Sequence, residues 1–222
     1  MRVYLGRLTL HENLYFATRE IGRLYETGRY LHNYALTFAL GLANAPYFNA
    51  EQKPSYAEHL SPLNERGIYV TPARGVAIDY MLSTFKYANN AYHVEMTQGS
   101  RNTPSFGRAK EIAVGSVFEF AVLSEREMLK LPRWIRLGLW RSKAEIAWTK
   151  VEDAAQKLTA MLRSSLPLNP LDVSSAMRSF DLISMPPSSL VDHALLQTDW
   201  WVWDKNNKGL PAHMKYTFPE TP

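Results

Sequence analysis

The sequence predicts an α+β protein that folds as one compact unit. Residues 2–10, 117–123 and 145–151 are rich in aliphatic and aromatic side chains and have the length and composition of β-strands. Residues 28–43 instead carry apolar side chains at helical spacing and on most faces, which predicts a buried helix. The chain contains no internal repeat, no low-complexity run and no clean linker. These elements therefore belong to a single domain spanning residues 1–222.

Weaker patterns predict how the remaining segments are arranged. The strand at residues 2–10 has apolar side chains on both faces, which is typical of a central strand. Prolines punctuate residues 46–72, which predicts a long, partly packed excursion with few regular elements. Short strands are expected at residues 68–70, near its end, and at residues 76–85. Asp153 is expected to cap a short helix with Ala154, Leu158, Met161 and Leu162 on one face. Aromatic stretches around the turn 206–209 predict a C-terminal hairpin.

The composition limits the classes of function. The chain has 25 Lys and Arg residues against 21 Asp and Glu, so its net charge of +4 permits an acidic partner without requiring one. It contains no cysteine, which excludes disulfides, thiolate metal sites and thiol nucleophiles. No segment has the apolar core of a signal peptide or the roughly 18 consecutive apolar residues of a membrane span. A cytoplasmic protein without membrane contact is therefore expected.

The segment LPRWIRLGLWRSK, residues 131–143, is the strongest candidate site. It holds four cations and two tryptophans around one glycine, and no acidic residue. Lys and Arg bind phosphate groups, a bend at glycine brings backbone N–H groups close to one, and tryptophan stacks on a base. Neighbouring strand residues alternate between faces, so these side chains do not all face one ligand. The predicted nucleic-acid contacts are Arg133, Arg136, Gly138, Trp140, Arg141 and Lys143.

A structural interpretation of this segment is also open. A basic edge strand would use its charges to block edge pairing and would pack its tryptophans in the core. A second basic cluster consists of Arg101, Arg108 and Lys110, beside Gly107 and Phe106. Two glycine-associated basic loops on either side of a strand favour an extended polyanion over a small metabolite, although an ordinary solvated loop would have the same composition.

No sequence pattern supports catalysis or a metal site. The six histidines are scattered, and none stands in HExxH or HxH spacing. The motifs GxSxG and GxGxxG, and GxxxxGK followed by Ser or Thr, do not occur. His32 lies on an otherwise apolar helix, where a hydrogen-bonded structural histidine is commoner than a general base. We therefore expect no catalytic residue, no metal ligand and no cofactor.

Four segments together resemble a known family: LHNYALTFALGLANAPYF, YAEHLSPLNERGIYVTPA, NTPSFGR and LPRWIRLGLWRSKAEI. Their order and spacing are similar to those of the Csc-one family, the type I-D members of the Cas-five group of CRISPR RAMP proteins. The similarity covers residues 2–151 and continues more weakly through LNPLDV and MPPSSLVDHALL. It implies a ferredoxin-like, RRM-related βαββαβ core with a long projecting hairpin, or thumb, at residues 86–107. Additional C-terminal strands would form an extension over residues 152–222.

The resemblance implies a non-catalytic RNA-binding subunit of a type I-D Cascade complex. In that family the protein grips the 5′ handle of the guide crRNA and caps the backbone filament in antiviral DNA interference. The implied partners are the guide crRNA, the Cas-seven-type backbone subunit and the large subunit, while contact with target DNA next to its recognition motif stays open. RLGLWRSK would be the RAMP glycine-rich loop, with Arg136, Arg141 and Lys143 on handle phosphates. It has a single glycine, which favours its side chains over its backbone amides, and His32 joins the expected RNA contacts.

Two other functions are open alternatives. Some Cas-five relatives trim the CRISPR repeat as metal-independent endoribonucleases, for which this chain offers only His32, His93 and Tyr80 as general bases. A protein–protein adaptor would instead dock a neighbouring subunit through its aromatic C-terminus, with incidental RNA contact. A handle-binding subunit must also contact the backbone and large subunits, and the hairpin at residues 86–107 and the surface around residues 200–203 are the expected contacts.

Overall fold

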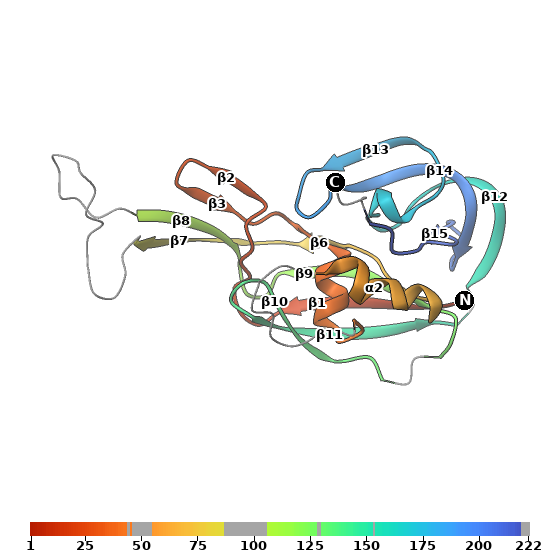
Figure 1. The fold of residues 1–222 in the computed structure, drawn as a ribbon, viewed down its shortest axis with the longest axis horizontal. Coiled ribbons are helices and arrows are strands. Elements are labelled where there is room, and N and C mark those ends of the chain that lie inside the picture. Colours follow the sequence, from red (N-terminus) through yellow and green to blue (C-terminus); the bar gives the residue numbers. More distant parts are fainter. Residues whose placement is uncertain (44, 46–54, 87–105, 128–129, 153, 219–222) are drawn as a thin grey trace.

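The structure is a computed structural model that describes residues 1–43, 45, 55–86, 106–127, 130–152 and 154–218. It confirms the α+β class, with strands far more abundant than helices. The structure contains three sheets. Apolar residues of the main sheet, both helices and the C-terminal strands pack together in one core. Figure 1 shows the main sheet and helices in the lower part of the molecule and the C-terminal sheet above them.

The main sheet has the strand order β10–β11–β1–β9–β6–β4, and β5 also pairs with β9. The strand β1 is central, as its two apolar faces predicted, and runs antiparallel to both β9 and β11. The expected strands at residues 117–123, 145–151 and 68–70 are confirmed as parts of β9, β11 and β5. The sheet consists of β1 (Arg2–Leu10), β4 (Tyr30–Leu31), β5 (Ile68–Val70), β6 (Ala73–Ala77), β9 (Val117–Ser124), β10 (Trp134–Leu137) and β11 (Ser142–Val151).

The helices differ from the sequence prediction. Helix α1 spans only Asn33–Ala39 instead of residues 28–43, because Tyr30–Leu31 form β4 and pair with β6. His32 begins the helix as its N-cap, and Gly41 follows its end with a φ of 69°. A second helix, α2 (Tyr56–Glu65), lies within the stretch expected to be an excursion. The described residues between β9 and β11 (125–127 and 130–141) contain no helix, so the second helix of a βαββαβ core is not found there.

The second sheet has the order β2–β3–β8–β7 and extends away from the main sheet (Figure 1). Its strands β7 and β8 pair antiparallel from Tyr80 opposite Ile112 to Lys86 opposite Phe106. They form the base of the predicted projecting hairpin, whose residues 87–105 lie outside the described part. The strand expected at residues 76–85 is wrong as one element, because it is divided between β6 and β7. The sheet consists of β2 (Arg19–Ile21), β3 (Leu24–Glu26), β7 (Tyr80–Lys86) and β8 (Phe106–Ile112).

The third sheet is built from the C-terminal residues in the order β12–β14–β13, with β15 also paired to β14. The helix expected after Asp153 is wrong, because residues 155–163 are a strand that pairs with β14. The predicted C-terminal hairpin is confirmed: β14 pairs with β15 from Trp200 opposite Pro211 to Val202 opposite Gly209. The elements are β12 (Ala155–Arg163), the 3₁₀ turn η1 (Pro170–Asp172), β13 (Met177–Ile183), β14 (Leu190–Val202) and β15 (Gly209–Pro211).

A buried polar cluster joins the C-terminal residues to α1 and β5. It consists of Asn33, Tyr69, Asp172 and Tyr216, together with the backbone N–H of the exposed Thr217. One carboxylate oxygen of Asp172 accepts hydrogen bonds from Asn33 Nδ2 and the Tyr69 hydroxyl, both at 2.8 Å. Its other oxygen accepts the backbone N–H of Thr217, also at 2.8 Å. Burial raises the pKa of Asp172 from 3.8 to about 7, although all three donors favour the charged form. The cluster holds the C-terminal part against the first half of the chain.

Candidate nucleic-acid interface

One face of the main sheet is solvent-accessible over part of its area, and we call this part the open face. Directly paired residues of neighbouring strands point to the same side. Arg136 pairs with Lys143 on this side, whereas Ile135 pairs with Ala144 on the opposite side, in the core. The open face consists of Trp134 and Arg136 of β10, Lys143, Glu145, Ala147 and Thr149 of β11, Leu5, Arg7 and Thr9 of β1, and Val117 and Glu119 of β9.

The cations of residues 131–143 lie along one edge of this face, as predicted. We call Arg133, Arg136, Arg141 and Lys143 the basic edge. Arg136 Nη1 donates to the backbone oxygen of Arg141 at 2.8 Å and lies 3.7 Å from Glu12 Oε2. Lys143 Nζ lies 4.3 Å from the ring centre of Trp134. Both cations are solvent-exposed. These contacts leave donor groups of the edge facing solvent.

Acidic side chains partly balance the basic edge, although the segment itself contains none. Arg133 Nε donates to Glu145 Oε1 at 2.7 Å, and this hydrogen bond lowers the pKa of Glu145. Glu12 Oε2 accepts the backbone N–H of Lys143 at 2.8 Å. Glu12 is more than a hundred residues away in sequence. In the folded protein, the net charge around the basic edge is therefore less positive than the sequence of residues 131–143 alone indicates.

The tryptophans of the segment are exposed rather than buried. Trp134 is 42% exposed and Trp140 is 52% exposed. The Trp140 ring lies 4.8 Å from the Tyr15 ring at an interplanar angle of 32°, and His11 packs its ring edge against Trp134. β10 is the edge strand of the main sheet, as the structural interpretation requires, but the expected packing of its tryptophans in the core is wrong. Exposed, supported indoles provide surfaces on which a base can stack.

The turn at Gly138 lies so close to residues 14 and 15 that only glycine fits there. Its φ is 70°, and a Cβ atom would lie 2.6 Å from both the Tyr15 carbonyl oxygen and Leu14 Cδ1. The next amide, of Leu139, donates to the same Tyr15 oxygen at 2.9 Å. The Arg141 amide donates to the Gly138 oxygen at 3.2 Å. Because both amides have protein partners, the geometry agrees with the expectation that side chains, not backbone amides, offer ligand contacts here.

The second predicted cluster is on a different sheet. Arg108 and Lys110 lie on β8, and Arg108 is exposed. Lys110 Nζ is 2.6 Å from Glu26 Oε1 and 4.2 Å from the ring centre of Tyr80; its hydrogen bond lowers the pKa of Glu26. Arg101 lies outside the described residues. The two basic clusters are therefore not neighbours in one sheet.

His32 is a structural residue, and its assignment to the RNA contacts is corrected. It is 4% exposed, its Nδ1 accepts the backbone N–H of Tyr34 at 3.2 Å, and its Nε2 lies 3.0 Å from the Ser188 hydroxyl. Burial lowers its pKa from 6.5 to about 4. These contacts cap α1 and keep the imidazole away from the surface. His93, the other histidine considered as a general base, lies outside the described residues.

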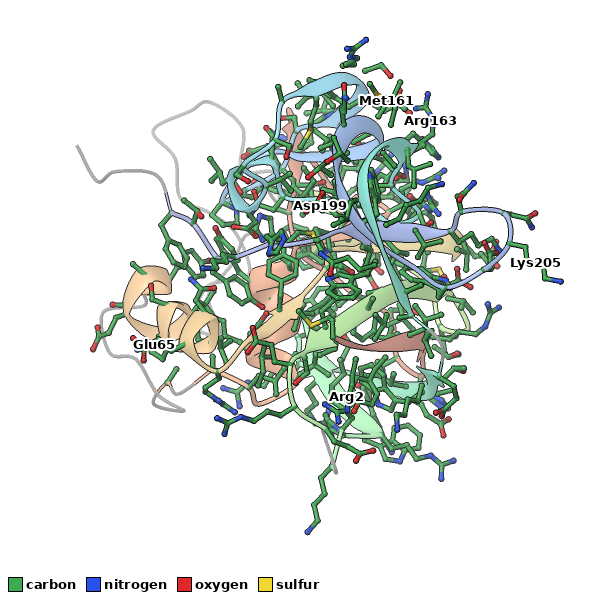
Figure 2. All side chains as sticks on the ribbon, turned by 90° about the vertical axis from the view of Figure 1, so that its right-hand side faces the viewer. Arg2, Glu65, Met161, Arg163, Asp199 and Lys205 are labelled. Carbon is green, nitrogen blue, oxygen red and sulfur yellow. The ribbon has the colours of Figure 1, made fainter. Side chains whose placement is uncertain are left out.

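The structure also contains a cleft that the sequence did not predict. It has a volume of about 690 Å³, within the range typical of ligand sites. One side is formed by Leu5, Arg7 and Thr149 of the open face. The other side comes from the end of β12 at Arg163 and from the turn between β14 and β15, which includes Lys208. Figure 2 shows that Arg163, at the end of β12, and Lys205, in the turn, lie on the same side of the molecule.

The comparison with protein families decides which proteins this chain is related to. The family described as type I-D CRISPR-associated protein Cas5/Csc1 matches residues 1–219. The chain belongs to this family. The resemblance inferred from the four quoted segments is thus confirmed, and a CRISPR-associated role follows from Cas5/Csc1 membership. A search of curated proteins found no match.

Two other properties of this Cas5/Csc1 chain concern metals and membranes. In the described ranges, no group of three or more His, Asp or Glu side chains is arranged to hold a metal ion. None of the helices there is long and apolar enough to cross a membrane.

Proposed function

We propose that this chain is a non-catalytic crRNA-binding subunit of the type I-D Cascade complex. It holds the 5′ handle of the guide crRNA and caps the backbone filament during antiviral DNA interference. The basic edge carries this proposal, because it presents cations and exposed indoles together at one border of the open face. Phosphate contacts from the cations would position the RNA, and stacking on Trp134 or Trp140 would hold unpaired bases.

The strand order supports a ferredoxin-like origin of the core. Strands β11, β1, β9 and β5 lie side by side and are antiparallel, and α1 and α2 occupy the connection from β1 to β5. We assign β1, the two helices, β5 and β9 to the βαββ part of a ferredoxin-like core and β11 to its last strand, with β10 in the connection where the second helix is expected. In RRM domains of this type the exposed sheet face binds RNA. The open face of this chain is the equivalent surface.

Contacts with the backbone and large subunits are assigned to the second sheet. Tyr80, Leu82 and Phe106 expose apolar surface on β7 and β8, at 42%, 55% and 42% of their areas. Exposed apolar side chains of this kind are typical of protein interfaces. Trp200, one of the expected contacts, is fully buried and is therefore a core residue.

The proposal is tested by anisotropy of labelled repeat-handle RNA across a salt series. The test variant replaces Arg136, Arg141 and Lys143 by alanine, and the control replaces three exposed cations elsewhere, Arg66, Arg178 and Lys215. Loss of three phosphate contacts should weaken binding by at least about tenfold. It should also reduce the slope of log affinity against log salt by about 2. The control variant should match the wild type.

Two results would contradict the proposal. If the folded triple variant binds the handle RNA like the wild type, the basic edge is a structural border and does not hold RNA. If the purified wild type shortens repeat RNA in the absence of divalent metal, the non-catalytic assignment is wrong. In that case the endoribonuclease alternative replaces it.

A further inference from the structure

We infer that the open face and the cleft form one continuous track for single-stranded RNA, in which the cleft receives the phosphates that follow those held at the basic edge. The inference rests on the proposed function and extends it to a second, separate group of contacts. The cleft residues Arg7, Arg163 and Lys208 are the assigned phosphate ligands.

Both ends of the track are on the same side of one sheet. Arg136 and Lys143 are opposite each other on β10 and β11, at the edge. Arg7 pairs with Ala147 of β11 and also with Glu119 of β9, on the same face. Adjacent strands are about 4.8 Å apart, so β10 and β9 are separated by about 15 Å. A strand of RNA a few nucleotides long spans that distance.

The surface between the two ends of the track is accessible to solvent. Ala147 and Thr149 of β11 are exposed, and Thr9 of β1 is partly exposed. None of these three side chains is large, so the chain does not block the path. A cation lies at each end of the path, Lys143 at the edge and Arg7 at the mouth of the cleft. The face therefore offers room for bases between two sites for phosphate.

The ionisable side chains that line the cleft are mostly cationic. The residues that line it include four cations, Arg7, Arg74, Arg163 and Lys208, and a single carboxylate, Glu119. Arg74 is occupied structurally, because Nη1 pairs with the buried Asp192 at 3.0 Å and Nη2 donates to the Ser165 oxygen at 3.0 Å. Arg7 is held by Glu119 at 2.7 Å, with its side chain 57% exposed. The cleft is thus positive and suits a phosphate.

Arg163 and Lys208 are the cations with the weakest internal partners. Arg163 donates to the backbone oxygen of His193 and forms no ion pair within the described residues. Lys208 Nζ is 3.9 Å from Asp204, and its side chain is 65% exposed. Little internal bonding is lost when these two groups turn to a phosphate. They are the residues on which the inference depends most.

The turn that carries Lys208 is preorganised. One carboxylate oxygen of Asp204 accepts the backbone N–H groups of both Asn206 and Lys208 at 2.8 Å. The Gly209 amide donates to the Ser165 hydroxyl at 2.8 Å, which fixes the turn to the chain after β12. The amide side chains of Asn206 and Asn207 line the cleft and can donate to and accept from base edges. A fixed turn loses little entropy when it binds.

The test compares Arg163→Gln/Lys208→Gln with a matched control, Arg178→Gln/Lys215→Gln, in full-length protein. Both double variants remove two exposed positive charges. Binding of handle RNA, and of the same RNA shortened stepwise from either end, is measured by anisotropy across a salt series. The cleft variant should bind the full handle at least about tenfold more weakly than the wild type. The slope of its log affinity against log salt should be smaller by about 1.4. The control should match the wild type, and circular dichroism checks that both variants are folded.

Shortening the RNA distinguishes the cleft from a general charge effect. Affinities of the wild type and the cleft variant should converge once the RNA no longer reaches the cleft, and the end from which shortening causes this gives the direction of the strand. If the wild type binds the handle and the cleft variant binds equally well, the inference is overturned while the proposed function stands. If the two curves stay apart at every length, the cations act at long range and the track is also overturned. If the wild type does not bind the handle, both the proposed function and the inference fail.

Discussion

The open face and the buried polar cluster both concentrate charged and hydrogen-bonding side chains, yet their groups are satisfied differently. In the buried polar cluster, both oxygens of Asp172 have protein donors at 2.8 Å. On the open face, Lys143 packs on a tryptophan ring and Arg136 is 3.7 Å from its nearest carboxylate. The first arrangement leaves no capacity for a ligand, whereas the second leaves donors directed to solvent.

This difference indicates that the buried polar cluster serves stability, whereas the open face is suited to binding. A buried charge is destabilising unless its partners are in place, so each substitution there affects folding. Exposed ion pairs contribute little to folding, so the same residue types can be changed on the open face with small structural effect. We therefore expect variants of the cluster to affect stability and variants of the face to affect RNA affinity.

The largest effect is expected from Asp172→Ala. The substitution leaves the Asn33 amide, the Tyr69 hydroxyl and the Thr217 N–H without their shared acceptor in the core. The free energy of unfolding should fall by about 3–5 kcal/mol, measured by urea denaturation. The exposed Glu65→Ala is the control and should change it by less than about 0.5 kcal/mol. A loss for Asp172→Ala as small as that of the control would show that the cluster does not hold the C-terminal part.

The next effect is a pair of opposing pH dependences. Asp172 has a folded pKa of about 7 against an ordinary 3.8, so the folded state binds its proton more tightly and this contribution to stability is lost as pH rises from 4 to 7. His32 has a folded pKa of about 4 against 6.5, so its contribution is lost as pH falls from 6.5 to 4. The contribution is about 4 kcal/mol for Asp172 and about 3 kcal/mol for His32, and the two oppose each other between pH 4 and 6.5.

Single variants should reveal the two dependences separately. Asp172→Asn should give a protein whose unfolding free energy rises between pH 4 and 6.5, because His32 then acts alone. His32→Asn retains a helix N-cap and should give the reverse, a free energy that falls over the same range. Urea denaturation at a series of pH values measures both slopes. Equal slopes in the two variants would contradict the assignment of the pKa shifts to these residues.

The smallest effect on folding is expected from Glu145→Gln on the open face. Glu145 accepts from Arg133 and lies 3.3 Å from His11 Nε2. Its removal should hardly change the melting temperature, because the partners are exposed. It should raise the affinity for handle RNA by about two- to fivefold and steepen the salt slope by about 0.7, since Arg133 becomes available to a phosphate. A weaker RNA complex would show that Glu145 contributes to binding instead of competing with it.

Elements with a strong local pattern were predictable from the sequence, whereas those decided by a distant strand were not. The apolar faces of β1 and β9 predicted both strands and the central place of β1. Leu158, Met161 and Leu162 fall at helical spacing, yet β12 is a strand because β14 supplies hydrogen-bonding partners along its length. A register shift between Lys157 and Ala160 also breaks the alternation that would have marked a strand. Helix α1 was overextended because the pairing of β4 with β6 cannot be seen locally.

The candidate site was predictable only where its residues are contiguous. The basic edge lies within one 13-residue segment, so its cations, glycine and tryptophans could be identified together. The acid Glu12 is brought to it by folding alone. The cleft combines Arg7, Arg163 and Lys208 from three distant parts of the chain, and no local pattern marks any of them.

The position of Tyr216 has a consequence for how the chain acquires its structure. Its hydroxyl lies 2.7 Å from that of Thr37 and accepts the Val70 amide at 3.1 Å, and its backbone is bonded on both sides to the Asn64 side chain. The space between α1 and β5 is therefore filled by a residue 179 positions after Thr37 and 146 positions after Val70. Until that distant contact forms, the apolar surface of the first half stays incomplete. Contacts this distant in sequence slow folding and prolong exposure to aggregation, so the folding chain is at its most vulnerable before its C-terminal strands have docked.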